Sequence, residues 1–208
     1  MIKVFFLFFE SAGTWDRISQ AQRSLIYVFT THLLPILALV SFVEGWGLHH
    51  WGKWQPRFHL LKDFSITTVV TYEVIQLILS AVMVLVSALL LLKISRTFHS
   101  RGTYTQAFTA VAYAFSPMFL MRMLNAVPSA NPWAIWGIGI AMSLWVFYQG
   151  LPRVLQPDPT HAFGLYLSMI FVMLLTSGIE RVMTALYLLG YIDLQNSYLA
   201  RAFPSFFQ

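Results

Sequence analysis

The chain has 208 residues, of which 58% are apolar, 16% aromatic and only 10% charged, and it contains no cysteine. A soluble domain usually carries about 25% charged residues, so this chain could not cover a water-exposed surface. The composition excludes an ordinary soluble domain, a disordered chain and a disulfide-stapled secreted scaffold. It predicts an all-α fold, a polytopic membrane helix bundle.

The net charge of +5 is not concentrated in a long basic run, because the 13 Lys and Arg residues are scattered through the hydrophilic gaps. We therefore expect contacts with membrane lipids and no binding of nucleic acid. The lack of cysteine excludes thiol catalysis and cysteine-ligated metals, and no cofactor is predicted.

A membrane-spanning helix needs about 20 mostly apolar residues, and five stretches qualify. They are residues 24–43, 74–92 with an uncharged approach over 64–72, 102–121, 133–150 and 159–179. Residues 182–192 are apolar but too short to cross alone, so they either continue the fifth helix or lie on the membrane; four or six spans stay open. The predicted organisation is an interfacial segment over 1–23, a transmembrane domain over 24–192 and a tail over 193–208.

The first nine residues are mostly apolar and resemble a signal peptide, but they lack its cleavage pattern. We expect instead an amphipathic stretch on the membrane surface that runs into Trp15 and Ile18.

The orientation in the membrane is weakly encoded, because basic residues divide seven against six between the two sides. The densest basic loop without an acid contains Lys93, Arg96 and Arg101. The positive-inside rule then places the amino terminus in the cytoplasm. These three residues are the candidate contacts with headgroups or a partner.

Two prolines lie inside predicted helices, Pro35 in the first and Pro117 in the third. Each removes a backbone donor and predicts a helix kink, and in lipid the freed carbonyl needs another partner. A hinge or a binding cavity at the break is the alternative interpretation.

Small residues at four-residue spacing allow helices to approach closely. The fourth predicted helix has Gly137 with Ala141 and Gly139 with Ser143. With similar spacing in the third helix, this predicts a compact bundle centred on the third and fourth helices. A homodimer face is the alternative.

The segment between the first two predicted spans, residues 44–59, is interpreted as an interfacial loop. Its three tryptophans fit an aromatic belt and predict an amphipathic cap on the bilayer. Its three histidines lack acidic or cysteine companions at a regular spacing, so no metal site is predicted. These residues are Trp46, Trp51, Trp54, His49, His50 and His59.

Ionisable groups within the spans are the best functional leads. Glu73 lies two turns inside the second helix if that helix starts near Ser65, and it could bind a cation, relay a proton or hold Arg122 or Arg181. The interpretation that the sequence favours is a headgroup-level carboxylate stabilised by the helix dipole. Glu180 and Arg181 are weaker candidates, and as adjacent helical residues they should point about 100° apart.

Catalytic motifs are missing from the sequence: it has no Gly-x-Ser-x-Gly, no His-Glu-x-x-His and no phosphate-binding glycine loop. We therefore predict that the protein is not an enzyme.

Several short motifs resemble the bacterial branch of the Yip1 family. They are Ala112-Tyr-Ala-Phe-Ser-Pro117, Val127-Pro-Ser-Ala-Asn-Pro-Trp133, Tyr148-Gln-Gly-Leu-Pro-Arg153, Pro157-Asp-Pro-Thr-His-Ala162 and Glu10-Ser-Ala-Gly-Thr-Trp-Asp-Arg-Ile18. The resemblance is clear over residues 103–173, and the five-span layout extends it over most of the chain.

The resemblance implies a five-helix protein of the bacterial inner membrane with a cytoplasmic amino terminus. Eukaryotic members act in vesicle traffic and engage Rab-type GTPases, a role that does not transfer to a bacterium. Those members carry an Asp-Leu-x-Gly-Pro element near the first helix, and this chain has only His32-Leu-Leu-Pro35 there.

Three functions follow from these features. The leading hypothesis is a non-enzymatic membrane protein that binds partner proteins, or copies of itself, or organises the bilayer. The second is a small transporter or lipid-handling protein that uses Glu73. The third is an accessory subunit of a larger membrane complex.

Overall fold

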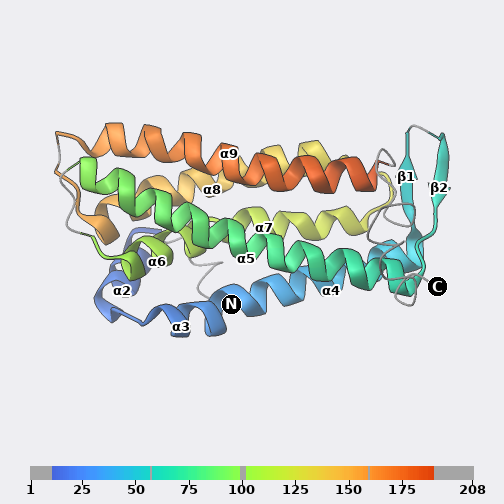
Figure 1. Cartoon of the computed structure of the whole chain (residues 1–208), viewed down its shortest axis with the longest axis horizontal. Helices are drawn as coiled ribbons and strands as arrows, with labels where there is room; N and C mark the ends of the chain where they lie inside the picture. The colour runs from blue at the N-terminus through green and yellow to red at the C-terminus, as the bar shows by residue number, and fades with distance from the viewer. Residues whose placement is uncertain (1–10, 57, 99–101, 159, 190–208) are drawn as a thin grey trace.

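A computed structural model describes residues 11–56, 58–98, 102–158 and 160–189. The elements in chain order are α2 (Ser11–Ala21), α3 (Leu25–Val28), a π-helical turn η1 (Phe29–Leu33), α4 (Leu34–Trp51), β1 (Lys53–Gln55), β2 (Leu60–Lys62), α5 (Ile66–Thr97), α6 (Tyr104–Ala114), α7 (Ser116–Arg122), a 3₁₀ turn η2 (Met123–Ala126), α8 (Pro132–Leu155) and α9 (Ala162–Leu188). The long helices run along a common axis, with β1 and β2 at one end of the bundle (Figure 1).

Five helical segments in the described part are long and apolar enough to cross a membrane, which confirms the predicted helix bundle. They are Leu25–Trp51, Ile66–Thr97, Tyr104–Ala126, Pro132–Leu155 and Ala162–Leu188. Their lengths of 23 to 32 residues correspond to roughly 35 to 48 Å, longer than a hydrocarbon core of about 30 Å. Each helix therefore reaches past the hydrocarbon or tilts within it.

Of residues 44–59, which the sequence interpretation took as an interfacial loop, residues 44–51 belong instead to the first span. The first span continues through Glu44 to Trp51 and ends at Gly52, whose φ of 65° suits glycine. An antiparallel pair then follows, with Lys53 opposite Lys62. The helix continues past Glu44 because that carboxylate is neutralised inside the bundle, as described below.

Of the two interpretations of residues 182–192, a continuation of the fifth helix is correct for residues 182–188. The helix α9 passes through Glu180 and Arg181 without a break and ends at Leu188. Residues 190–192 and the predicted tail lie outside the described residues.

Both helix-breaking prolines follow a local change in helix geometry. Pro35 lies two residues after the end of the π-helical turn η1, and the intervening Leu34 N–H donates to Phe29 O. Pro117 lies at the start of α7, after α6 has ended at Ala114. Local widening and helix interruption are recognised ways of accommodating a proline.

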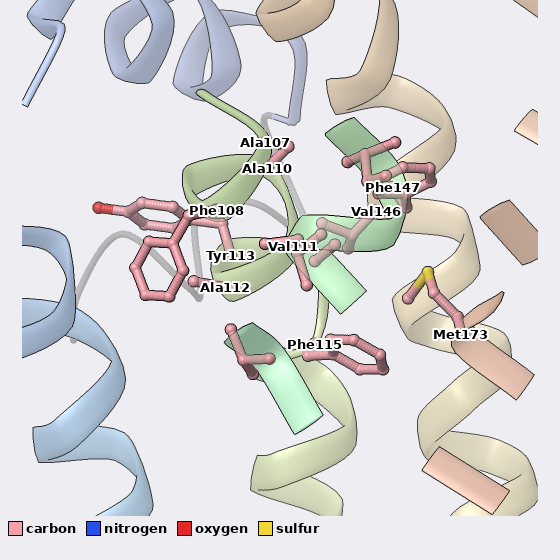
Figure 2. Close-up of a cluster of buried hydrophobic side chains, with 14 of the residues drawn as sticks. Ala107, Phe108, Ala110, Val111, Ala112, Tyr113, Phe115, Val146, Phe147 and Met173 are labelled. Atoms are coloured by element: carbon pink, nitrogen blue, oxygen red, sulfur yellow. The ribbon is translucent and has the colours of Figure 1, made fainter. Parts of the chain in front are cut away.

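The core of the bundle is formed by the third span, because 72% of an apolar 18-residue stretch in it is buried, against 28 to 44% for such stretches in the other spans. Alanines along α6, including Ala107 and Ala110, let aromatic side chains such as Phe108 and Phe147 pack around it (Figure 2). The third helix is thus central, as its small residues predicted.

The helix α8 packs against α7 through one of its two predicted pairs of small residues. A Cβ on Gly139 would lie 3.0 Å from Met118 Cα, and Ser143 Oγ accepts the Met118 N–H at 3.1 Å. A Cβ on Gly137 would meet nothing within 4 Å. Gly139 and Ser143 therefore serve packing within the chain, whereas Gly137 faces outward.

The amino-terminal helix α2 buries its apolar face against protein. Trp15 is fully buried, and a Cβ on Gly150 of α8 would lie 2.4 Å from its ring. Asp16 and Arg153 form an ion pair at 3.2 Å across the same interface. The amphipathic pattern around Trp15 and Ile18 thus serves packing on α8; residues 1–10 of the predicted interfacial segment lie outside the described part.

Candidate functional site

Polar side chains from four of the spans meet inside the bundle, toward the end that carries β1 and β2. Glu44 comes from α4, Glu73 from α5, Arg122 from the end of α7 and Arg181 from α9. Three of these were predicted from the sequence, and Glu44 was not. We call this set, with Asn125 and Ser80, the polar cluster.

Arg122 is the centre of the polar cluster. Its Nε donates to Glu44 Oε2 at 2.5 Å and its Nη2 to Glu73 Oε2 at 2.8 Å. The same guanidinium donates to Ser41 Oγ at 3.1 Å and to Ser80 Oγ at 3.3 Å. One buried cation therefore joins two carboxylates, which satisfies the requirement that buried charges be paired.

Glu44 is the charged residue of the polar cluster that sequence reasoning missed. It is 0% exposed and accepts hydrogen bonds from Arg122, from Asn125 Nδ2 at 2.9 Å and from Tyr72 OH at 3.3 Å. The sequence analysis ended the first span just before Glu44, because a charge was taken to mark the end of the apolar stretch. The signal that could have placed it inside was the apolar character of Trp46, Leu48 and Trp51 beyond it.

Arg181 lies beside this centre and is held by uncharged groups. Its Nε and Nη2 donate to Pro132 O at 3.0 and 2.5 Å, and its Nη2 donates to Asn125 Oδ1 at 3.1 Å. Asn125 thereby bridges Arg181 to Glu44. The sequence offered Arg122 or Arg181 as a partner for Glu73, and in the structure Glu73 pairs with Arg122. Arg181 contacts neither the Glu73 carboxylate nor the Arg122 guanidinium directly.

Glu180 points away from Arg181, in keeping with the 100° rotation between neighbours on a helix. Its Oε1 accepts the Ser80 hydroxyl at 2.5 Å, while its buried Oε2 has no hydrogen-bond partner among the described residues. A cavity of about 20 Å³ lies between Glu180, Arg122 and Trp136. That space is sufficient for about one water molecule.

Lys53, at the start of β1, extends the polar cluster toward the membrane surface. It is 1% exposed, and its Nζ donates to Asn125 O at 2.9 Å and Val127 O at 2.8 Å. Burial lowers the pKa of Lys53 to about 8, while the negative charge of Glu44 opposes this shift. Nothing in the local sequence signalled a buried lysine in this segment.

A groove of about 410 Å³ runs between α4 and α5 on the outer surface of the bundle. Glu73 lines it, is 7% exposed, and its Oε1 has no hydrogen-bond partner in the described part of the chain. Gly45 lets α5 approach closely, because a Cβ there would lie 3.2 Å from Glu73 Cγ. The other lining residues are mainly apolar: Ala38, Ser41, Phe42, Trp46, His49, His50, Ile66, Val69, Val70, Val74 and Leu77.

The predicted headgroup contacts lie far from the polar cluster. Lys93 and Arg96 are exposed near the end of α5, at the end of the bundle away from β1 and β2 (Figure 1). Arg101 lies outside the described residues. The structure thus separates the intramembrane charges from the exposed basic end.

Two of the three histidines considered as metal ligands make other contacts. His49 Nδ1 donates to Phe64 O at 3.1 Å, and His50 Nδ1 donates to Trp46 O at 3.2 Å. The described residues contain no group of three His, Cys, Asp or Glu side chains placed to hold a metal ion.

Apolar outer surfaces on five long helices around a buried set of charged and polar side chains define a polytopic integral membrane protein. The family model of the Yip1 domain matches residues 5–179, so the chain belongs to the Yip1 family. The match includes Glu44, Glu73 and Arg122 and ends just before Glu180. No curated protein and no solved structure gives a significant match.

Proposed function

We propose that this Yip1-family protein has a non-enzymatic role, binding a membrane component laterally and thereby assembling with partners or organising the bilayer. The observation that carries the proposal is the groove between α4 and α5, which opens on the outer surface and reaches Glu73. Surface grooves of this kind have to be filled by lipid or by another transmembrane segment.

The buried charges support a structural role for the interior. Arg122 is paired with Glu44 and Glu73, and a charge held this way has little freedom to serve as an acid or base. The cost of burying these groups is offset only while all of them stay together. The polar cluster therefore fixes the α4–α5–α7 arrangement that frames the groove.

A buried serine–histidine pair also argues for a structural rather than a catalytic role. His32 Nε2 lies 2.9 Å from Ser116 Oγ, and Ser116 Oγ donates to Ala112 O at 3.0 Å. When the hydroxyl hydrogen lies on that carbonyl, Oγ accepts from Nε2, the arrangement expected of a structural hydrogen bond. The pair bridges η1 and α7 near both prolines.

The exposed basic end is the proposed cytoplasmic face, where Lys93, Arg96 and Arg101 would meet anionic headgroups or an acidic partner. Burial of Arg122, Arg181 and Lys53 removes three basic residues from the opposite surface. The basic residues that remain are more numerous on the side of Lys93 and Arg96, which supports a cytoplasmic amino terminus. With the motif resemblance, it supports a location in a bacterial inner membrane.

Site-specific photocrosslinking in native membranes tests the proposal. A photoreactive residue at Phe42 or Val70, both exposed along the groove, should give discrete adducts. Ile179 on α9 is the matched control, because it is 63% exposed and, like Phe42, lies nine residues before the end of its helix. Equal, diffuse labelling at all three positions would contradict lateral binding.

A second candidate is a lipid-handling or transport function, which Glu73 favours because it lines the groove and one of its buried oxygens lacks a hydrogen-bond partner among the described residues. Reconstituted scramblase or flux assays on the wild-type protein and Glu73→Gln distinguish this from pure binding. Equal activity in both proteins would remove Glu73 from such a mechanism. An accessory-subunit role would appear as a single polypeptide captured at the groove positions.

A further inference from the structure

A polar pocket of about 490 Å³ lies at the end of the bundle away from β1 and β2, where the end of α2 meets the start of α6 (Figure 1). Its volume falls within the range of small-molecule binding sites. Eight of the ten described residues that line it are polar, and Ile18 and Val154 are the two apolar ones. These residues include one arginine and no acid. The pocket therefore differs from the mainly apolar groove between α4 and α5, and it favours an anionic ligand.

The pocket lies between the first residues of two membrane spans. Ser24 directly precedes the first span and Thr103 directly precedes the third, and both residues line the pocket. Because each span is longer than a hydrocarbon core of about 30 Å, its first residues reach the headgroup region of the bilayer. Phosphate groups of lipids are therefore present at the depth of the pocket.

Arg23 supplies the positive charge of the pocket. Its Cζ lies 4.8 Å from the centroid of the Tyr27 ring, so the guanidinium is stacked on an aromatic face. Arg23 forms no hydrogen bond or ion pair within the part of the chain that the structure describes. A stacked guanidinium keeps the N–H groups along its edge available, and their fork matches the oxygens of a phosphate.

Other lining residues keep hydrogen-bond donors available because their acceptor atoms are already used. Gln106 Oε1 accepts the Thr103 N–H at 2.8 Å, which orients the amide and leaves the Nε2 hydrogens for another acceptor. Ser24 Oγ accepts a backbone N–H at 3.3 Å and retains its own hydrogen. The Thr105 hydroxyl makes no hydrogen bond within the described chain, whereas two further lining hydroxyls donate to backbone carbonyls. The pocket thus combines one cation with several neutral donors.

We propose that this pocket binds a phosphate ester, with the Arg23 guanidinium donating to the phosphate oxygens and Thr105 and Gln106 supplying neutral donors. An anionic phospholipid headgroup and a soluble phosphate ester present the same acceptor oxygens. The position of the pocket beside the ends of two spans favours the headgroup. The site is separate from the groove between α4 and α5, so it is independent of the proposed lateral binding.

Two titrations of the full chain in mild detergent test this site. Native mass spectrometry measures binding of phosphatidylglycerol, and isothermal titration calorimetry measures binding of sn-glycerol 3-phosphate. Arg23→Gln should weaken binding about fivefold, because it removes a charged donor that is partly screened by solvent. Arg17→Gln is the matched control, since it removes the same charge from an exposed position on α2 that does not line the pocket, and it should bind like the wild-type protein.

A neutral variant tests the pocket independently of charge. Thr105→Val should weaken binding about threefold, whereas Thr71→Val, which removes a hydroxyl on α5 outside the pocket, should have no effect. A loss confined to the lipid assigns the phosphate to a headgroup, and a loss that includes glycerol 3-phosphate assigns it to a soluble ester. Binding of both ligands that is unchanged in Arg23→Gln, or absent from the wild-type protein, would overturn the inference.

Discussion

Arg122 Nε and Glu44 Oε2 lie 2.5 Å apart although their residues are 78 positions apart in the chain. The same guanidinium also holds Glu73, so one side chain ties the first, second and third spans together. Helices in lipid gain no hydrophobic drive to associate, and a buried ion pair of this kind strongly penalises their separation.

The two glutamates that pair with Arg122 should differ in their contribution to stability. Glu44→Gln should lower the free energy of unfolding by about 3 kcal/mol, because Glu44 is fully buried and also accepts from Asn125 and Tyr72. Glu73→Gln should cost less, about 1–2 kcal/mol, because one Glu73 oxygen has no partner to lose within the described chain. Reversible unfolding in mixed micelles measures both, and equal losses would contradict this ranking.

One hydroxyl, that of Ser143, contributes to the contact between α7 and α8. Ser143→Ala should destabilise the protein by about 1 kcal/mol, because Ser143 Oγ accepts the Met118 N–H that would otherwise be buried unpaired. Ser168→Ala is the control, since Ser168 donates to Gly164 O in its own helix. Thermal unfolding should distinguish the two variants, and matching melting temperatures would show that the Ser143 bond is dispensable.

Docking of α2 onto α8 requires a glycine. Gly150→Ala places a methyl group 2.4 Å from the Trp15 ring and should displace α2, lowering the melting temperature by several degrees in proportion to a cost of about 1–3 kcal/mol. Gly137→Ala, whose Cβ meets nothing within 4 Å, should be neutral or stabilising because alanine favours helix. Combining Gly150→Ala with Trp15→Leu should cost less than the sum of the single variants; simple additivity would argue against the clash.

The free energy of unfolding should depend on pH through the titration of Lys53. Its pKa is about 8 in the folded protein, against about 10.4 in an unfolded chain. Between these values the unfolded state binds more protons, so stability rises as pH increases from 8 to above 10, and below pH 8 this contribution is constant. The rise amounts to about 2–3 kcal/mol.

Unfolding measured at pH 8 and pH 10.5 should show that rise in the wild-type protein and a smaller one in Lys53→Met. Lys62→Met is the control, because Lys62 pairs with Lys53 in the β1–β2 register but is less buried. A Lys53→Met protein with the full wild-type rise would show that another group is responsible.

Much of the architecture could be predicted because lipid imposes strict local conditions on a chain. A segment such as 74–92 is long enough to cross, carries no charge and has no other stable state in hydrocarbon than a helix. The same reasoning found all five spans. It failed at Glu44, because a rule that ends a helix at a charge cannot tell that a partner lies on another helix.

The sequence by itself determined that this is a multi-pass membrane protein, because span length and charge are local properties, and its short motifs indicated the Yip1 family. It also drew attention to Glu73, Arg122 and Arg181 as charges within helices. Only the tertiary structure decided their partners, the role of Glu44 and the groove between α4 and α5. Those features depend on how each helix is rotated about its axis and how deep it lies relative to its neighbours, because side chains from separate helices meet only when both agree. No single stretch of sequence contains that information.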